Sequence, residues 1–135
     1  MKTVTAREAA TALFERLGSG ASPDELALHF DDDVDWFIPG DASVVPWIGR
    51  KRGRAGVAEF FTQLGREARP EEFTIETIVG EGSRCVVLGH LRTKVLATGR
   101  VIRSDFAFDI EVRDGLITRY HMFEDTFAVA AAFAR

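Results

Sequence analysis

This chain of 135 residues has little of what marks a secreted, metal-binding or membrane protein. It contains one cysteine, Cys85, so no internal disulfide can form and nothing requires an oxidising compartment. Its three histidines show no regular spacing with one another or with acids, so we expect no metal site and no cofactor. No apolar run is long enough to cross a bilayer, and the segment from Met1 to Glu8 lacks the apolar core of a signal peptide. We therefore expect a cytoplasmic protein with no membrane partner.

Positive charge is also in short supply. The chain has 17 Lys and Arg against 21 Asp and Glu, giving a formal charge of −4. Its one basic run, Arg50 to Arg54, reads in isolation as a phosphate contact or a nuclear signal. We interpret it instead as a solvated turn before a helix, because binding a nucleic-acid backbone needs an extended positive face. No nucleic-acid partner is expected.

Large apolar rings are plentiful. Hydrophobic residues make up 46% of the chain, and they include eleven Phe and two Trp. This content suffices for one globular domain with a sizeable core, and rings of this size also suit the walls of a cavity. We find no repeats, low-complexity tracts or linkers, so residues 1–135 are expected to form a single domain.

Helices are predicted in the first half of the chain and strands in the second. Capping boxes at Thr5–Glu8 and Ser22–Glu25 predict two helices, and apolar spacing predicts a third over about 54–68. Runs rich in β-branched and aromatic residues predict strands at 34–38, 73–79, 85–96, 100–112 and 116–124. Asp114-Gly115 supplies the positive φ of a tight hairpin turn between the last two. The fold class is therefore α+β, with a curved mixed sheet.

The final hairpin, from Asp105 to Thr126, resembles the end of the SnoaL-like branch of the nuclear transport factor 2-like superfamily, which includes ketosteroid isomerase. The matching positions are Arg113, Asp114, Gly115, Ile117, Asp125 and Thr126, with a further match at Pro46-Trp47, Gly49, Gly53 and Glu59-Phe60-Phe61. The resemblance implies a cone-shaped α+β barrel, in which a curved mixed sheet wraps around the N-terminal helices. It also implies a largely apolar pocket inside the cone and a homodimer formed through the outer face of the sheet.

The catalytic residues of the related enzymes are absent from the aligned positions. Ketosteroid isomerase uses an aspartate base together with a tyrosine and a protonated aspartic acid. The base falls near Phe37, the protonated acid near Phe108, and the tyrosine near Ala12 or Leu13. The Arg/Asp/Asp set of limonene epoxide hydrolase-like proteins falls near Gly89, Leu91 and Met122. None of these side chains transfers a proton.

Four other polar side chains are candidates for chemistry. Asp35 shares a strand face with Phe37, so it either enters the pocket as a displaced base or faces solvent beside a basic neighbour. Glu124 and Tyr120 share one strand face. Either Glu124 acts as an acid or base and Tyr120 as a hydrogen-bond donor at the pocket mouth, or Glu124 is only a carboxylate at the rim. His90 is a general base if it faces the pocket and a surface or interface residue if it does not.

Two functions follow as hypotheses. In the first, the protein binds a small apolar ligand without turnover, in a hydrophobic pocket lined by Trp36, Phe37, Trp47, Phe60, Phe61, Phe108, Tyr120 and Met122. In the alternative, it is an isomerase, cyclase or hydrolase acting on a small carbonyl or epoxide compound through Asp35 and Glu124, with His90 or Tyr120. In either case we expect a homodimer, with His90, Arg92, Arg119 and His121 contributing to the outer sheet face.

Overall fold

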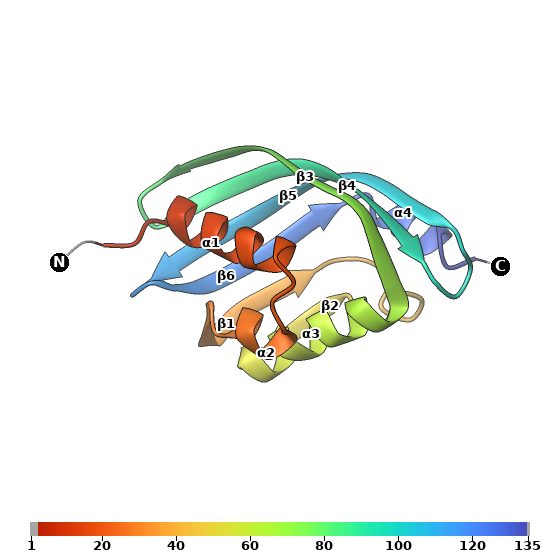
Figure 1. Cartoon of the computed structure of the whole chain (residues 1–135), viewed down its shortest axis with the longest axis horizontal. Coiled ribbons are helices and arrows are strands. Elements are labelled where there is room, and N and C mark those ends of the chain that lie inside the picture. Colours follow the sequence, from red (N-terminus) through yellow and green to blue (C-terminus); the bar gives the residue numbers. More distant parts are fainter. Residues whose placement is uncertain (1–2, 135) are drawn as a thin grey trace.

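A curved sheet and the helices on its concave side make up the fold (Figure 1). The computed structural model describes residues 3–134. The helices are α1 (Ala6–Gly18), α2 (Pro23–Ala27), α3 (Gly53–Glu67) and α4 (Thr126–Ala131). The strands are β1 (Phe30–Ile38), β2 (Gly49–Arg52), β3 (Ala68–Glu81), β4 (Arg84–Val95), β5 (Val101–Arg113) and β6 (Leu116–Glu124). Among the described residues, no helix is long and apolar enough to cross a membrane.

The sheet has the order β2-β1-β6-β5-β4-β3. Strand β1 runs parallel to β6, and all other neighbours are antiparallel. Helix α1 packs against β3, β4 and β5, while α3 packs against β1 and β2. The predicted α+β fold with a curved mixed sheet is confirmed. The sheet is open, because its edge strands β2 and β3 do not pair with each other.

Both predicted capping boxes are present. The Thr5 hydroxyl accepts a hydrogen bond from the Glu8 backbone N–H at 3.1 Å, and Ser22 accepts one from Glu25 at the same distance. Each glutamate in turn accepts from the backbone N–H of its cap residue. These contacts satisfy backbone donors that would otherwise lack partners in the first helical turn. The sequence therefore specified where α1 and α2 begin.

The region before α3 differs from the prediction. The segment interpreted as a solvated turn includes the edge strand β2, whose Arg50 pairs with Phe37 and whose Arg52 pairs with Asp35. Strand β1 also starts earlier than predicted, at Phe30, so the Asp-rich segment 31–33 lies within the strand. The basic residues of β2 suit an edge strand, because one side of such a strand faces solvent.

The hairpin of β5 and β6 forms as predicted. Asp114 and Gly115 have φ angles of 52° and 79°, which gives the turn the hand that matches strand twist. The apolar residues on the inner face of β5 are all buried: Phe106, Phe108, Ile110 and Val112. This face of the hairpin looks toward the helices, and its charged reverse forms part of the outer face of the sheet.

Candidate functional site

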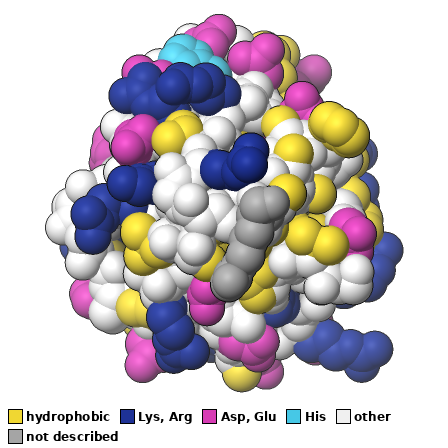
Figure 2. All heavy atoms as spheres, turned by 90° about the vertical axis from the view of Figure 1, so that its right-hand side faces the viewer, with side chains coloured by type: hydrophobic (Ala, Val, Ile, Leu, Met, Phe, Trp, Pro, Cys, Tyr) yellow, Lys and Arg dark blue, Asp and Glu magenta, His cyan; other side chains and the backbone are white. Residues whose placement is uncertain are grey.

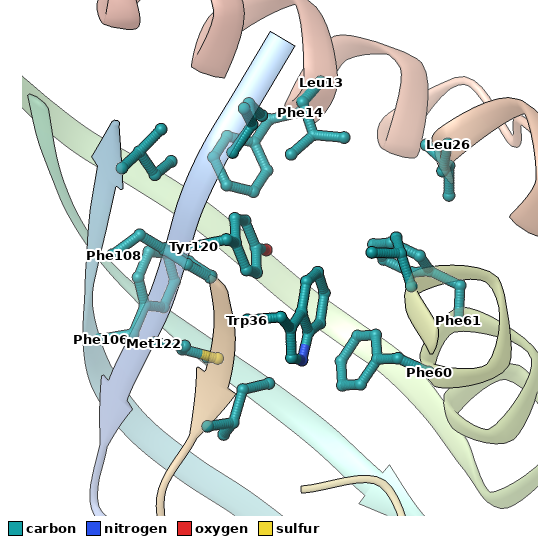
Figure 3. Close-up of a cluster of buried hydrophobic side chains, with 14 of the residues drawn as sticks. Leu13, Phe14, Leu26, Trp36, Phe60, Phe61, Phe106, Phe108, Tyr120 and Met122 are labelled. Carbon is teal, nitrogen blue, oxygen red and sulfur yellow. The ribbon is translucent and has the colours of Figure 1, made fainter. Parts of the chain in front are cut away.

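A cavity of about 660 Å³ lies between the inner face of the sheet, α1 and α3. Six of the side chains that the sequence placed at a pocket line it: Trp47, Phe60, Phe61, Phe108, Tyr120 and Met122. Figure 3 shows several of these rings converging from β5, β6 and α3. Hollows of about 600 and 710 Å³ elsewhere on the surface are shallow and have charged rims. The enclosed apolar cavity is therefore the candidate binding site.

The sequence did not identify the walls supplied by α1 and β3. Phe14 and Leu17 line the cavity from α1, and the helical spacing of Phe14 with Ala10 was a signal that it faces inward. From β3, both Ile75 and Ile78 line it, although they lie three residues apart. A register shift after Ile75 explains this pair, because a bulge changes which side chains face inward. No pattern in the sequence predicted that bulge.

Glu124 brings a carboxyl group to this apolar cavity. It lies at the end of β6, partly buried, and its carboxyl group makes no hydrogen bond or ion pair with any residue from 3 to 134. Burial raises the pKa of Glu124 from 4.5 to about 7, because removing water disfavours the charged form. A carboxyl group with this pKa can release or accept a proton near neutral pH.

Tyr120 lies four residues before Glu124 on the same strand face, with Met122 between them. Its side chain is 3% exposed, and its hydroxyl makes no hydrogen bond with the described residues. The oxygen points toward the interior in Figure 3. Burial, with a smaller contribution from the Glu124 charge, raises the Tyr120 pKa, so the phenol stays protonated. The cavity is therefore lined by a neutral hydroxyl donor and by a titratable carboxyl group on the same strand face.

Asp35 lies on the opposite, outer face of the sheet. Its carboxylate is 3.0 Å from His121 Nε2, 3.3 Å from Arg50 and 3.4 Å from Arg119. The contact with His121 is the main cause that lowers the pKa of Asp35, and the two arginines add to it. The hypothesis that Asp35 enters the pocket as a base is wrong, and the alternative of an outward carboxylate with basic neighbours holds.

Phe37 and Trp36 also differ from their predicted positions. Phe37 is on the outer face, where its ring meets His121 edge-on and Arg50 lies 4.6 Å from the ring centre. Trp36 faces inward but is covered by Tyr120, which stacks on it at 4.3 Å, so it supports the cavity wall without lining it. Strand alternation gives the reason: with Trp36 inside, both neighbours must point outward.

His90 is on the outer face of β4, outside the cavity. Its Nδ1 lies 2.6 Å from Glu76 and its Nε2 lies 3.1 Å from Glu72. The hydrogen bond with Glu76 is the main cause that raises the pKa of His90. The structure therefore bears out the surface interpretation of His90 and excludes direct contact with a ligand in the cavity. No group of three His, Cys, Asp or Glu side chains suited to a metal ion occurs in residues 3–134.

Residues 10–120 match the SnoaL-like domain family. The chain belongs to this family. A nuclear transport factor 2-like protein from Burkholderia xenovorans LB400 superimposes with a TM-score of 0.86 at 27% identity, covering 99% of each chain. TerC, in a crystal structure with polyporic acid, has a TM-score of 0.79 at 24% identity, covering 95% of this chain and 97% of TerC.

A curated relative is the patulin synthesis protein F of Aspergillus clavatus. It is 28% identical over 111 residues, covering 80% of this chain and 53% of that protein. This chain therefore spans about half the length of that relative.

The structure also accounts for the apolar residues at the family's catalytic positions. Phe108 and Met122, which the alignment placed there, line the cavity. Phe37 does not, but its inward neighbours Trp36 and Ile38 are apolar too. At Gly89, an added Cβ would collide with the Thr74 carbonyl oxygen and lie 2.6 Å from the Phe106 ring, so no polar side chain fits. Phe108 and Met122 therefore contribute apolar wall and no titratable group to the cavity.

Proposed function

We propose that this SnoaL-like protein binds a small, mostly apolar molecule that carries a carbonyl or hydroxyl group. The observation that carries the proposal is the cavity of about 660 Å³, with its aromatic walls and with Tyr120 and Glu124 facing it. Such a cavity encloses the apolar body of a ligand, while the two polar groups fix its orientation. The crystal structure of TerC with polyporic acid supports the choice of a small-molecule ligand.

Proton transfer on the bound molecule is the second candidate function, favoured by the raised pKa of Glu124. The ionised Glu124 carboxylate takes a proton from the carbon beside a ligand carbonyl. The Tyr120 phenol donates a hydrogen bond to the oxygen as negative charge develops there. The protonated Glu124 then returns the proton to the same or another carbon, which completes an exchange or an isomerisation. This is chemistry of the isomerase and cyclase kind, with Glu124 in place of the family's usual base.

We expect the protein to accelerate the exchange of α-protons in 1-tetralone, a bicyclic ketone small enough for the cavity. Glu124→Gln should lower the rate by about 100-fold or more, since a positioned general base typically contributes that much. Proton NMR in D₂O measures the exchange, and native mass spectrometry of the ketone complex measures binding separately. Glu81→Gln, at an exposed position on β3, is the matched control and should keep the full rate. A Glu124→Gln protein with the wild-type rate would refute Glu124 as the base, and absence of a complex would refute the binding function.

We propose that the protein forms a homodimer through the outer face of the sheet, as family members do. Leu88 pairs with Ala107 and Ala107 with Phe123, so an apolar row crosses three strands. Phe123 is 48% exposed and Leu88 38% exposed on this row. At the end of the molecule near the C-terminus, hydrophobic side chains instead lie in small groups among charged ones (Figure 2). A location in the cytoplasm stays a prediction from the sequence.

Sedimentation at micromolar concentration should therefore show a dimer that Phe123→Glu converts to a monomer, because a buried unpaired carboxylate destabilises an interface. Phe127→Glu is the control, since Phe127 is 83% exposed on α4 and lies off the sheet. A wild-type monomer, or a Phe123→Glu protein that remains dimeric, would contradict this interface.

A further inference from the structure

The charged residues that line the cavity all have the same sign. They are Glu15 from α1, Glu72 from β3 and Glu124 from β6. No Lys, Arg or His from the described part of the chain lines it. The Glu72 carboxylate contacts His90 on the outer face and Glu15 is exposed on α1, so Glu124 is the acidic side chain that is buried at the cavity.

Neighbouring basic residues compensate this charge only in part. On the outer face, His90 Nε2 lies 3.1 Å from the Glu72 carboxylate. The same histidine also contacts Glu76 through its Nδ1. Glu15 and Glu124 have no ion pair with any residue from 3 to 134. The nearby Arg16 pairs with Glu25 at 2.7 Å and so is directed away. A negative charge inside the cavity therefore finds no cation to stabilise it.

Three aromatic rings form part of the cavity wall. Phe14, Phe73 and Phe108 form a cluster in which Phe14 lies 5.6 Å from Phe73 and 5.2 Å from Phe108, measured between ring centres. All three rings line the cavity. The face of an aromatic ring is negative, so it attracts an ammonium ion and repels a carboxylate.

We propose that the cavity sorts ligands by charge: it takes neutral and cationic apolar molecules and rejects carboxylates of the same shape. A carboxylate would lose its water, meet the like charge of Glu124, and gain no cationic partner from the lining residues. A ketone of the same size loses little on entry and gains the Tyr120 hydroxyl as a donor. An ammonium ion gains Glu124 as a carboxylate partner. This inference rests on the proposed binding function and narrows its ligand class.

Three naphthalene derivatives of matched size test the inference by calorimetry at pH 8, where Glu124 is ionised. The probes are 2-acetylnaphthalene, 2-naphthylmethylammonium and 2-naphthoate. We expect 2-naphthoate to bind at least about thirtyfold more weakly than either of the others, because bringing like charges together is strongly unfavourable. Equal affinity for the ketone and the carboxylate would overturn the charge sorting while leaving the binding function intact. Failure of all three probes to bind would overturn both.

Glu124→Gln separates the charge from the shape of the site. The variant keeps the size of the side chain, so we expect the ratio of ammonium to carboxylate affinity to fall by about tenfold, equivalent to about 1.4 kcal/mol. The ratio is taken within each protein, so any change in affinity that is common to the two ligands cancels. Glu81→Gln, outside the cavity, should leave the ratio unchanged. An unchanged ratio in Glu124→Gln would overturn the role of this carboxylate.

Discussion

Replacing Glu124 by glutamine is expected to raise the free energy of unfolding at pH 8 by about 3 kcal/mol and at pH 5 by less than about 1 kcal/mol. The cause is the raised pKa of the folded state, about 7 against 4.5 for an ordinary glutamate. The unfolded chain loses this proton near pH 4.5, whereas the folded chain holds it until about pH 7. Between these values the folded state binds more protons, so the wild type loses stability as pH rises. Glutamine does not ionise, so the free energy of unfolding of the variant does not fall with pH for this reason.

Urea unfolding of the wild type and the variant at pH 5 and pH 8 measures the effect, since a change in midpoint at constant slope reports stability. Titrating groups common to both proteins cancel in the difference. The exposed Glu81→Gln protein is the control, with no expected change at either pH. A difference between wild type and Glu124→Gln that is the same at pH 5 and pH 8 would show that Glu124 titrates normally. It would also remove the main support for proton transfer by this residue.

Trp36→Ala is expected to lower the free energy of unfolding by about 3–5 kcal/mol, which is typical for removing a buried tryptophan. The side chain is 1% exposed, and its ring stacks on Tyr120 at 4.3 Å and contacts Phe60 at 4.8 Å. Figure 3 shows it between these two rings. Its loss opens a cavity behind Tyr120, so the hydroxyl that faces the ligand loses its support. We therefore expect weaker binding of 2-acetylnaphthalene as well.

Trp36→Phe is the informative companion variant. The Trp36 Nε1 donor is buried without a hydrogen-bond partner among the described residues, so phenylalanine removes no hydrogen bond. The loss should be clearly smaller than for alanine, because only part of the ring volume disappears and an unsatisfied donor goes with it. Equal losses for Phe and Ala, measured by urea unfolding, would mean that Nε1 has a partner. A loss below about 1 kcal/mol for Ala would contradict a tightly packed role for Trp36.

The two polar groups of the cavity depend on the same packing. Tyr120 is held between Trp36 and Phe108, whose ring centres lie 4.3 and 5.0 Å from its own. Glu124 lies farther along β6, where the apolar wall removes water without supplying a basic partner. The rings that shape the cavity thus also keep the phenol neutral and move the carboxyl pKa toward neutrality. Changes in the aromatic wall should therefore alter binding and proton transfer together.

Local sequence was enough to place several elements. The capping boxes at Thr5 and Ser22 fixed the starts of α1 and α2, because the contacts span three residues and need no tertiary partner. The turn of the β5–β6 hairpin and the inner face of β5 were equally readable, since Asp114-Gly115 and the alternation in β5 are local signals. The register shift between Glu111 and Val112 was not predicted. The residues on which the resemblance to the SnoaL-like family rests lie in this hairpin, before α3 and within α3. Together they led from the sequence to the correct fold.

Only the tertiary structure decided which side chains of a strand face inward, where the bulges occur, and which charged side chains find a partner. Whether Phe37 or Trp36 faces inward depends on a single-residue shift, and neither apolar side chain reveals its direction from sequence alone. The same shift moved Asp35 out to His121, Arg50 and Arg119, on elements distant in sequence. Glu124 acquired its raised pKa because its strand face meets apolar walls and no basic group. Desolvation and ion pairing depend on residues from several elements. The sequence therefore predicted Glu124 and Asp35 equally as catalytic candidates, and only the fold showed that Glu124 lines the cavity and Asp35 does not.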